Sequence, residues 1–137
     1  MVKITGEYHG DLHCSARHEP SGGTLVTDAP KDNQGRGEAF SPTDLVATSF
    51  GTCIATTMAI VARRHGVELK GLKFSVTKEM SADTPRRIVR LASEFWMPIA
   101  RSHPQAKLLE GVAQACPVHH SLHPAIERPV TFHWAGE

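Results

Sequence analysis

The residues of this sequence with the most distinctive chemistry are its three cysteines, Cys14, Cys53 and Cys116. Two thiols in a reducing compartment can act as a redox pair. One thiolate attacks the O–O bond of a peroxide and becomes a sulfenic acid, and the other condenses with it to a disulfide that an external thiol reduces. Sequence separation alone does not show that Cys53 and Cys116 meet, because a disulfide requires Cα atoms within about 7 Å.

The local sequence gives each cysteine a different setting. Cys53 falls in the middle of a predicted helix, where most free cysteines are small buried side chains. Cys116 precedes Pro117, and because proline favours the first helical position, Cys116 is predicted to be an N-cap. Unpaired backbone N–H groups and the helix dipole are expected to lower the pKa of that thiol, although a packing role is the alternative. Cys14 falls in a predicted strand and is expected to be a core or edge residue.

The histidines near Cys116 suggest a rival chemistry. His119, His120 and His123 follow Cys116 closely, and together with Cys53 they are residue types that bind zinc. Their spacing matches no standard closed zinc site. A Cys/His metal centre is therefore the weaker hypothesis, and no metal ligand is predicted.

A long predicted helix from Ser41 to Gly66 must position Cys53. Ser41 can cap its first turn, with Asp44 three residues later as in a capping box. Gly66 follows a basic last turn and allows a left-handed C-terminal residue. No charged residue occurs between positions 45 and 62, so we expect this helix to be buried on nearly every side, in the core or at a subunit interface. A membrane span is disfavoured because threonines and serines dilute the run.

The remaining pattern predicts strands on both sides of this helix and a second helix from Ser102 to about Ala115. The predicted strands cover residues 2–8, 12–18, 24–27, 72–80, 87–97 and 130–134. Strands and helices that are segregated along the chain indicate an α+β fold. The length of 137 residues predicts one domain, 1–137.

Composition and charge limit the classes of function and the cellular location that are expected. The formal net charge is +1 and the pI is about 7.9, so no nucleic-acid partner is expected. The cysteine count is odd and the first residues lack the apolar segment of a secretory signal. We therefore expect a cytoplasmic protein with reduced thiols and no membrane association.

Two stretches together resemble the OsmC/Ohr family, which comprises osmotically inducible protein C and the organic hydroperoxide resistance proteins. The run from Ser41 to Cys53, SPTDLVATSFGTC, is similar to the family helix that carries P-x-x-L, small residues and a cysteine. The run from Ala115 to Val118, ACPV, is similar to the second cysteine motif of the family.

This resemblance implies an intertwined α+β homodimer, with antiparallel sheets around a long central Cys-bearing helix and two active sites at the subunit interface. It implies thiol-dependent reduction of organic hydroperoxides without metal, haem or flavin. Cys53 would be the peroxidatic cysteine and Cys116 the resolving one. A dithiol or lipoyl-type reductant would restore both thiols.

The sequence departs from the family pattern at two places. The family carboxylate that follows the proline is Thr43 here, and the nearest acid is Asp44. The family arginine of the first hairpin is not matched, because residues 11–14 read Asp-Leu-His-Cys and Arg17 comes later. These departures indicate a divergent OsmC-like branch. The alternative function is a non-catalytic protein that binds a small ligand or senses redox state.

Overall fold

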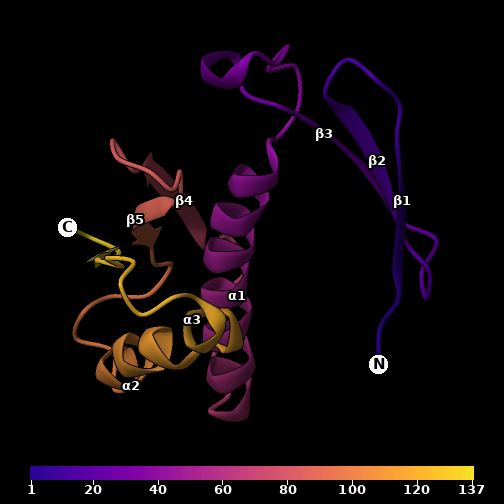
Figure 1. The fold of residues 1–137 in the computed structure, drawn as a ribbon. Helices are drawn as coiled ribbons and strands as arrows, with labels where there is room; N and C mark the ends of the chain where they lie inside the picture. The colour runs from indigo at the N-terminus through magenta and orange to yellow at the C-terminus, as the bar shows by residue number, and fades with distance from the viewer. The chain divides into compact units, whose positions relative to one another are not determined.

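The computed structural model describes residues 1–137, which form two compact units, 1–46 and 47–137. Figure 1 shows the elements of both units. The expected α+β class is confirmed, and the order along the chain is three strands, the long helix, two strands, the shorter helices and a last strand. The single domain over 1–137 stays a prediction.

The first unit contains a three-stranded antiparallel sheet in the order β1-β2-β3. Its strands are β1 (Ile4–Tyr8), β2 (His13–His18) and β3 (Thr24–Asp28), close to the predicted ranges. The register places Ile4, Tyr8, Cys14, Ala16 and Leu25 on one face of the sheet. Within the first unit this apolar face stays largely uncovered, and Cys14 lies half-buried in the central strand.

A buried carboxylate organises the loop that follows β3, which contains the short 3-10 helix η1 (Lys31–Asn33). Asp28 is almost completely buried. His13 Nδ1 lies 2.6 Å from Asp28 Oδ1, and the backbone N–H of Glu38 donates to Asp28 Oδ2 at 3.1 Å. These hydrogen bonds, with Arg36 at 3.5 Å, tie the loop to the sheet. The contact with His13, followed by the charge of Arg36, lowers the pKa of Asp28 despite its burial.

The long predicted helix is α1 (Pro42–Arg64). Its capping box is confirmed, because the Asp44 N–H donates to Ser41 Oγ at 3.1 Å and the Ser41 N–H donates to an Asp44 carboxylate oxygen at 2.9 Å. Gly66 has a φ of 71°, and the Val67 N–H donates to the Ala62 carbonyl at 2.9 Å. This is a Schellman C-terminus, which confirms the predicted end of the helix.

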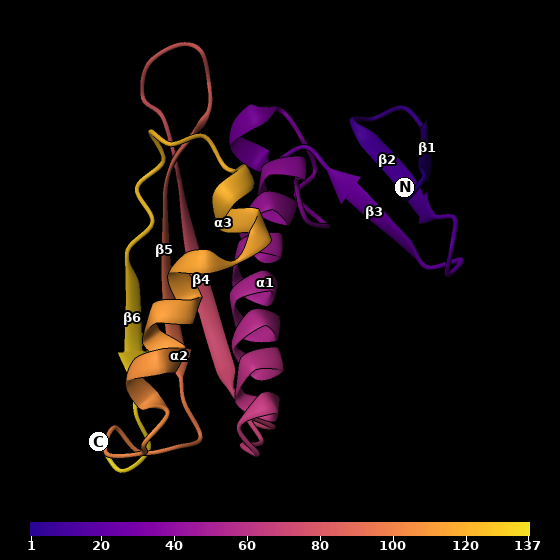
Figure 2. The ribbon, with the colours of Figure 1, turned by 90° about the horizontal axis from the view of Figure 1, so that it is seen from below.

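The second unit packs helices on one face of a sheet in the order β4-β5-β6 (Figure 2). The strands are β4 (Lys73–Met80), β5 (Ile88–Trp96) and β6 (Val130–His133), and the helical segments after β5 are α2 (Ala106–Val112), η2 (Ala113–Ala115) and α3 (Pro117–Ser121). Strands β4 and β5 are antiparallel, whereas β6 runs parallel to β5. Buried side chains from α1, β5 and α2, together with Cys116 and Trp134, form one core.

The prediction that the second helix begins at Ser102 is wrong. Residues 101–105 form turns, and α2 begins at Ala106 after Gln105. Pro104 disfavours a helical conformation for the residue before it. The His103 ring, rather than Ser102, accepts a backbone N–H from Gln105 at 3.1 Å.

Within this chain α1 is buried along one stripe, and the expected burial of its other side at a subunit interface stays a prediction. Its buried residues recur every three or four positions and form one stripe: Ala47, Phe50, Gly51, Ile54, Met58 and Ala62. Thr52 and Thr56 are exposed, and Ile60 is 50% exposed. By length and composition α1 could cross a membrane, but a core helix passes the same test. One face of α1 is therefore not covered by the second unit.

The closest approach of α1 to the sheet yields a stability prediction. A Cβ on Gly51 would lie 2.6 Å from the Phe74 ring and 2.8 Å from Val76 Cγ2. Gly51→Ala should therefore overpack this contact and lower the free energy of unfolding by about 1–3 kcal/mol in urea denaturation. Gly111→Ala in α2 is the matched control, because nothing lies within 4 Å of its Cβ position. It should be neutral or stabilising by up to about 1 kcal/mol, and equal losses for both variants would contradict the close packing.

The Asp28 contacts predict a pH dependence of stability. Because the folded state lowers the pKa of this carboxyl, its stabilisation is complete above the unfolded pKa of about 3.9 and is lost as pH falls toward the folded pKa. Asp28→Asn should lower the melting temperature at pH 7, and the difference from the original protein should shrink below about pH 4. Glu38→Gln, at an exposed carboxylate, is the control. A pH-independent difference for Asp28→Asn would contradict this account.

Candidate redox site

Helix α1 presents Cys53 at the edge of its buried stripe. Cys53 lies one turn after the buried Phe50 and is itself half-buried against the hydrophobic core. The helix therefore holds this thiol between the protein interior and the surface.

Cys116 lies at the N-cap of α3, as the sequence predicted. Its backbone is extended, with φ −71° and ψ 149°, and Pro117 occupies the first turn of α3. The Cys116 Sγ accepts the backbone N–H of His119 at 3.2 Å. Unlike Cys53, Cys116 is fully buried.

The fold brings these two cysteines together. Helix α3 lies beside α1 in two perpendicular views (Figures 1 and 2). Cys53 lies close enough to Cys116 to raise the pKa of its thiol, and no disulfide joins the two cysteines. The catalytic roles of the two residues stay a prediction, but the proximity that such roles require is present.

The expectation of a lowered pKa for Cys116 is wrong. Burial raises the pKa of this thiol and is the largest influence. The N–H groups of His119 and Val118 act in the opposite direction, as expected at a helix N-terminus, while the hydrogen bond and the charge of Cys53 raise the pKa further. Cys116 is therefore a protonated thiol at neutral pH, because desolvation outweighs the helix terminus.

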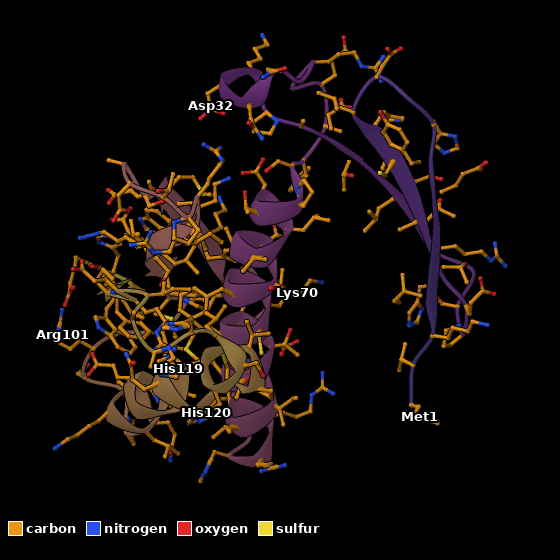
Figure 3. All side chains as sticks on the ribbon, viewed as in Figure 1. Met1, Asp32, Lys70, Arg101, His119 and His120 are labelled. Carbon is orange, nitrogen blue, oxygen red and sulfur yellow. The ribbon has the colours of Figure 1, made fainter.

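Two histidines that follow Cys116, His119 and His120, lie on α3 (Figure 3). The His119 ring stacks on Phe50, with centroids 6.4 Å apart, and the His120 ring meets it edge-on at 5.5 Å. Arg128 Nη1 donates to the His119 carbonyl at 2.6 Å. Burial, followed by the charges of Arg128 and His120, lowers the pKa of His119. From the sequence, His119 was considered only as a metal ligand. Its position soon after Cys116 is the sequence feature that could have indicated its backbone contact with the Cys116 sulfur.

The histidines do not assemble around Cys116 as a ligand set. No group of three His, Cys, Asp or Glu side chains is arranged to hold a metal ion. His120 is exposed, and the His123 ring accepts the backbone N–H of Ala125 at 3.1 Å.

The polar residues at and near the two departures from the family pattern make local contacts. Asp44 closes the capping box of α1. His13 and Arg36 contact Asp28, and Arg17 Nε lies 3.7 Å from Glu19. These residues belong to the first unit, and any role beside the thiols stays a prediction.

The chain matches known proteins over most of its length. A family model described as OsmC-like protein matches residues 35–129. A solved protein from Psychrobacter arcticus 273-4, named for osmotic stress induction and a detoxification response, is 42% identical, with a TM-score of 0.88 over 96% of this chain and 94% of that chain. This similarity confirms the expected α+β OsmC fold, which is that of a small soluble protein.

More distant structures share the fold alone. An organic hydroperoxide resistance protein OsmC from Legionella pneumophila is 15% identical, with a TM-score of 0.77 over 96% of each chain. An organic hydroperoxide resistance protein from Elizabethkingia anophelis is 14% identical, with a TM-score of 0.74 over 98% of this chain and 96% of that chain. The comparison with curated proteins returned no match.

The contact between the thiols predicts how Cys116 titrates. Because Cys53 raises the pKa of Cys116, Cys53→Ser should lower that pKa toward, but not to, its ordinary value, since burial remains. The measurement is the ultraviolet absorbance of the thiolate against pH, in a Cys14→Ser background with and without Cys53→Ser. An identical Cys116 titration in both proteins would refute the contact.

Proposed function

The chain belongs to the OsmC-like protein family, and on that premise we propose that it is a thiol-dependent peroxidase that reduces organic hydroperoxides. The single observation that carries this proposal is the interaction of Cys53 on α1 with Cys116 at the N-cap of α3. Two structures with the same fold are named organic hydroperoxide resistance proteins, which supports the substrate class.

The proposed reaction has three steps with different thiol roles. The Cys53 thiolate attacks one oxygen of the hydroperoxide, the O–O bond breaks, and the alkoxide leaves and takes up a proton as the alcohol. Cys116 sulfur then attacks the Cys53 sulfenic acid, forming a disulfide and releasing water. An external dithiol, of the dihydrolipoyl type, reduces the disulfide, so that one hydroperoxide and one dithiol give one alcohol, one water and one external disulfide.

The surroundings of the two thiols support this division of roles. Cys53 is half-buried, so a substrate can reach it, whereas Cys116 is fully buried with a raised pKa. A thiolate is the attacking species, and a buried protonated thiol is a poor first nucleophile. Cys116 suits the second step, because its target would form on the neighbouring sulfur.

The substrate preference is supported by apolar packing. Cys53 contacts the hydrophobic core, and the neighbouring positions on α1 are Phe50 and Ile54. An apolar environment favours a hydroperoxide with an organic group over hydrogen peroxide, since transfer of that group from water is favourable.

A homodimer is part of the proposal, and each unit supplies its own support. Helix α1 leaves one face uncovered, with Ile60 50% exposed, and the sheet of the first unit exposes Ile4, Tyr8 and Leu25. Uncovered apolar surface of this kind is typical of protein interfaces. Cytoplasmic localisation, with reduced thiols, completes the proposal.

A non-catalytic redox sensor is the second candidate. It is favoured by Thr43, which stands where the family has a carboxylate and lies 3.2 Å from Ser41 Oγ in the helix cap. The ion pair of Arg17 with Glu19 also favours a sensor, because Arg17 comes later than the family arginine and is paired with a carboxylate. A sensor would form the disulfide without sustained turnover.

Peroxidase assays on single substitutions test the proposal. With cumene hydroperoxide and dihydrolipoamide in the presence of a chelator, the protein should turn over and Cys53→Ser should abolish turnover. Cys116→Ser should consume one equivalent of peroxide and accumulate a Cys53 sulfenic acid, because the resolving thiol is gone. A dimedone-type probe and mass spectrometry detect that species.

Cys14→Ser is the matched control and should keep full turnover. Turnover that survives Cys53→Ser, or that stops with chelator, would overturn the thiol mechanism. Disulfide formation without turnover for any dithiol would favour the sensor.

A further inference from the structure

Helix α3 is a short element whose attachment to α1 depends on side-chain contacts. It comprises five residues, Pro117–Ser121, and a helix of this length is not stable in isolation. The ring of His119 stacks on the buried Phe50 of α1, with centroids 6.4 Å apart, and the partly buried Val118 packs against the core. Because Cys116 is the N-cap of this helix, we expect the burial of the Cys116 sulfur to depend on this attachment.

The setting of the His119 ring suits a neutral imidazole and not an imidazolium. Both ring nitrogens of an imidazolium are donors, and His119 Nδ1 is buried without a hydrogen-bond partner. Protonation would therefore leave a partly buried positive charge with a donor that lacks an acceptor. Burial is accordingly the largest influence that lowers the pKa of this histidine.

The titratable and charged groups around His119 come from α1, from α3 and from the segment before β6. On α3 they are His120, whose ring lies edge-on at 5.5 Å, and the protonated thiol of Cys116. Before β6, Arg128 Nη1 donates to the His119 carbonyl at 2.6 Å. The uncharged run of α1 contains one titratable side chain, Cys53, and η2 contains none. Of these groups, Arg128 and His120 act on the pKa of His119, and both positive charges lower it.

We propose that protonation of His119 detaches α3 from α1 and thereby exposes the Cys116 sulfur to solvent. In the detached state the ring lies in water, where it takes up a proton with the ordinary histidine pKa of about 6.5. The attached state has the lowered pKa, so its stabilisation is complete above about pH 6.5 and is lost as pH falls from there toward the lowered pKa. The inference goes beyond the proposed function, because it concerns the reduced protein and involves no peroxide.

Amide hydrogen exchange of the reduced protein tests this inference. The protection factor of a peptide that covers α3, corrected for the intrinsic pH dependence of exchange, should fall between about pH 7.5 and about pH 5.5. The expected fall is at least about twofold and up to about tenfold, as set by the uptake of one proton on opening. Peptides from α1 and β5 are the internal reference and should keep their protection, because the opening is local.

Substitutions of His119 separate protonation of the ring from its packing. His119→Phe keeps an aromatic ring against Phe50 and has no site for the proton, so the protection of α3 should no longer depend on pH. His119→Gln is a second variant without a titratable ring, and its α3 protection should be independent of pH as well. His65→Asn, at an exposed histidine after the end of α1, is the matched control and should keep the original pH dependence.

Labelling of Cys116 connects the detachment of α3 to the thiol. In a background of Cys14→Ser and Cys53→Ser, Cys116 is the one remaining cysteine. Its rate of reaction with dithiodipyridine, divided by the rate for the same protein unfolded in urea at the same pH, should rise by a similar factor as pH falls. The ratio removes the effect of pH on the probe and on the fraction of thiolate.

Four outcomes would overturn the inference. They are a pH-independent protection of α3 in the original protein, the original pH dependence in either His119 variant, an equal loss of protection in α1 and β5, and a labelling ratio of Cys116 that does not change with pH. An equal loss in all elements would report unfolding of the second unit as a whole. Because none of these measurements uses a hydroperoxide, a failure of the proposed peroxidase activity would leave their results unaffected.

Discussion

The buried meeting point of α1 and α3 is the contact on which the proposed chemistry depends. Cys53 lies on a long helix packed against a sheet, and Cys116 is the N-cap of a helix that begins at Pro117. Gly51 allows α1 to approach the side chains of Phe74 and Val76 closely. The sheet therefore fixes α1, and the core between α1, β5 and α2 holds the start of α3 against it.

Desolvation and the helix terminus compete at Cys116. The backbone N–H groups of His119 and Val118 stabilise a thiolate, whereas complete burial and the adjacent Cys53 disfavour it. Burial prevails because an uncharged thiol loses little on leaving water, while a thiolate loses its hydration. The two cysteines thus differ in accessibility, which suits two successive roles better than two equivalent ones.

The apolar surfaces that each unit leaves uncovered bear on whether two copies of the chain associate. The stripe of α1 that includes Phe50 and Ile54 is buried by the second unit, whereas the face with Ile60 is not. Within the first unit, the apolar face with Ile4 and Tyr8 is likewise exposed. Uncovered apolar surface of this kind is typical of an interface with another molecule.

The sequence by itself determined the features that depend on local backbone hydrogen bonds. The Ser41–Asp44 capping box, the helix end at Gly66 and the Cys116 N-cap were all predictable, because each requires only residues within one turn. Alternation of apolar residues likewise located the strands. The start of α2 was predicted wrongly, because the prediction relied on Ser102 as an N-cap and did not consider that Pro104 disfavours a helical conformation at the residue before it.

Only the tertiary structure decided the properties that depend on distant residues. The contact of Cys53 with Cys116, the raised pKa of Cys116 and the stacking of His119 on Phe50 join α1 to segments far along the chain. Motifs that resemble a family indicated the cysteine pair, but desolvation depends on every neighbour in space. For that reason a local rule predicted a lowered pKa at Cys116, and the packed core reversed its direction.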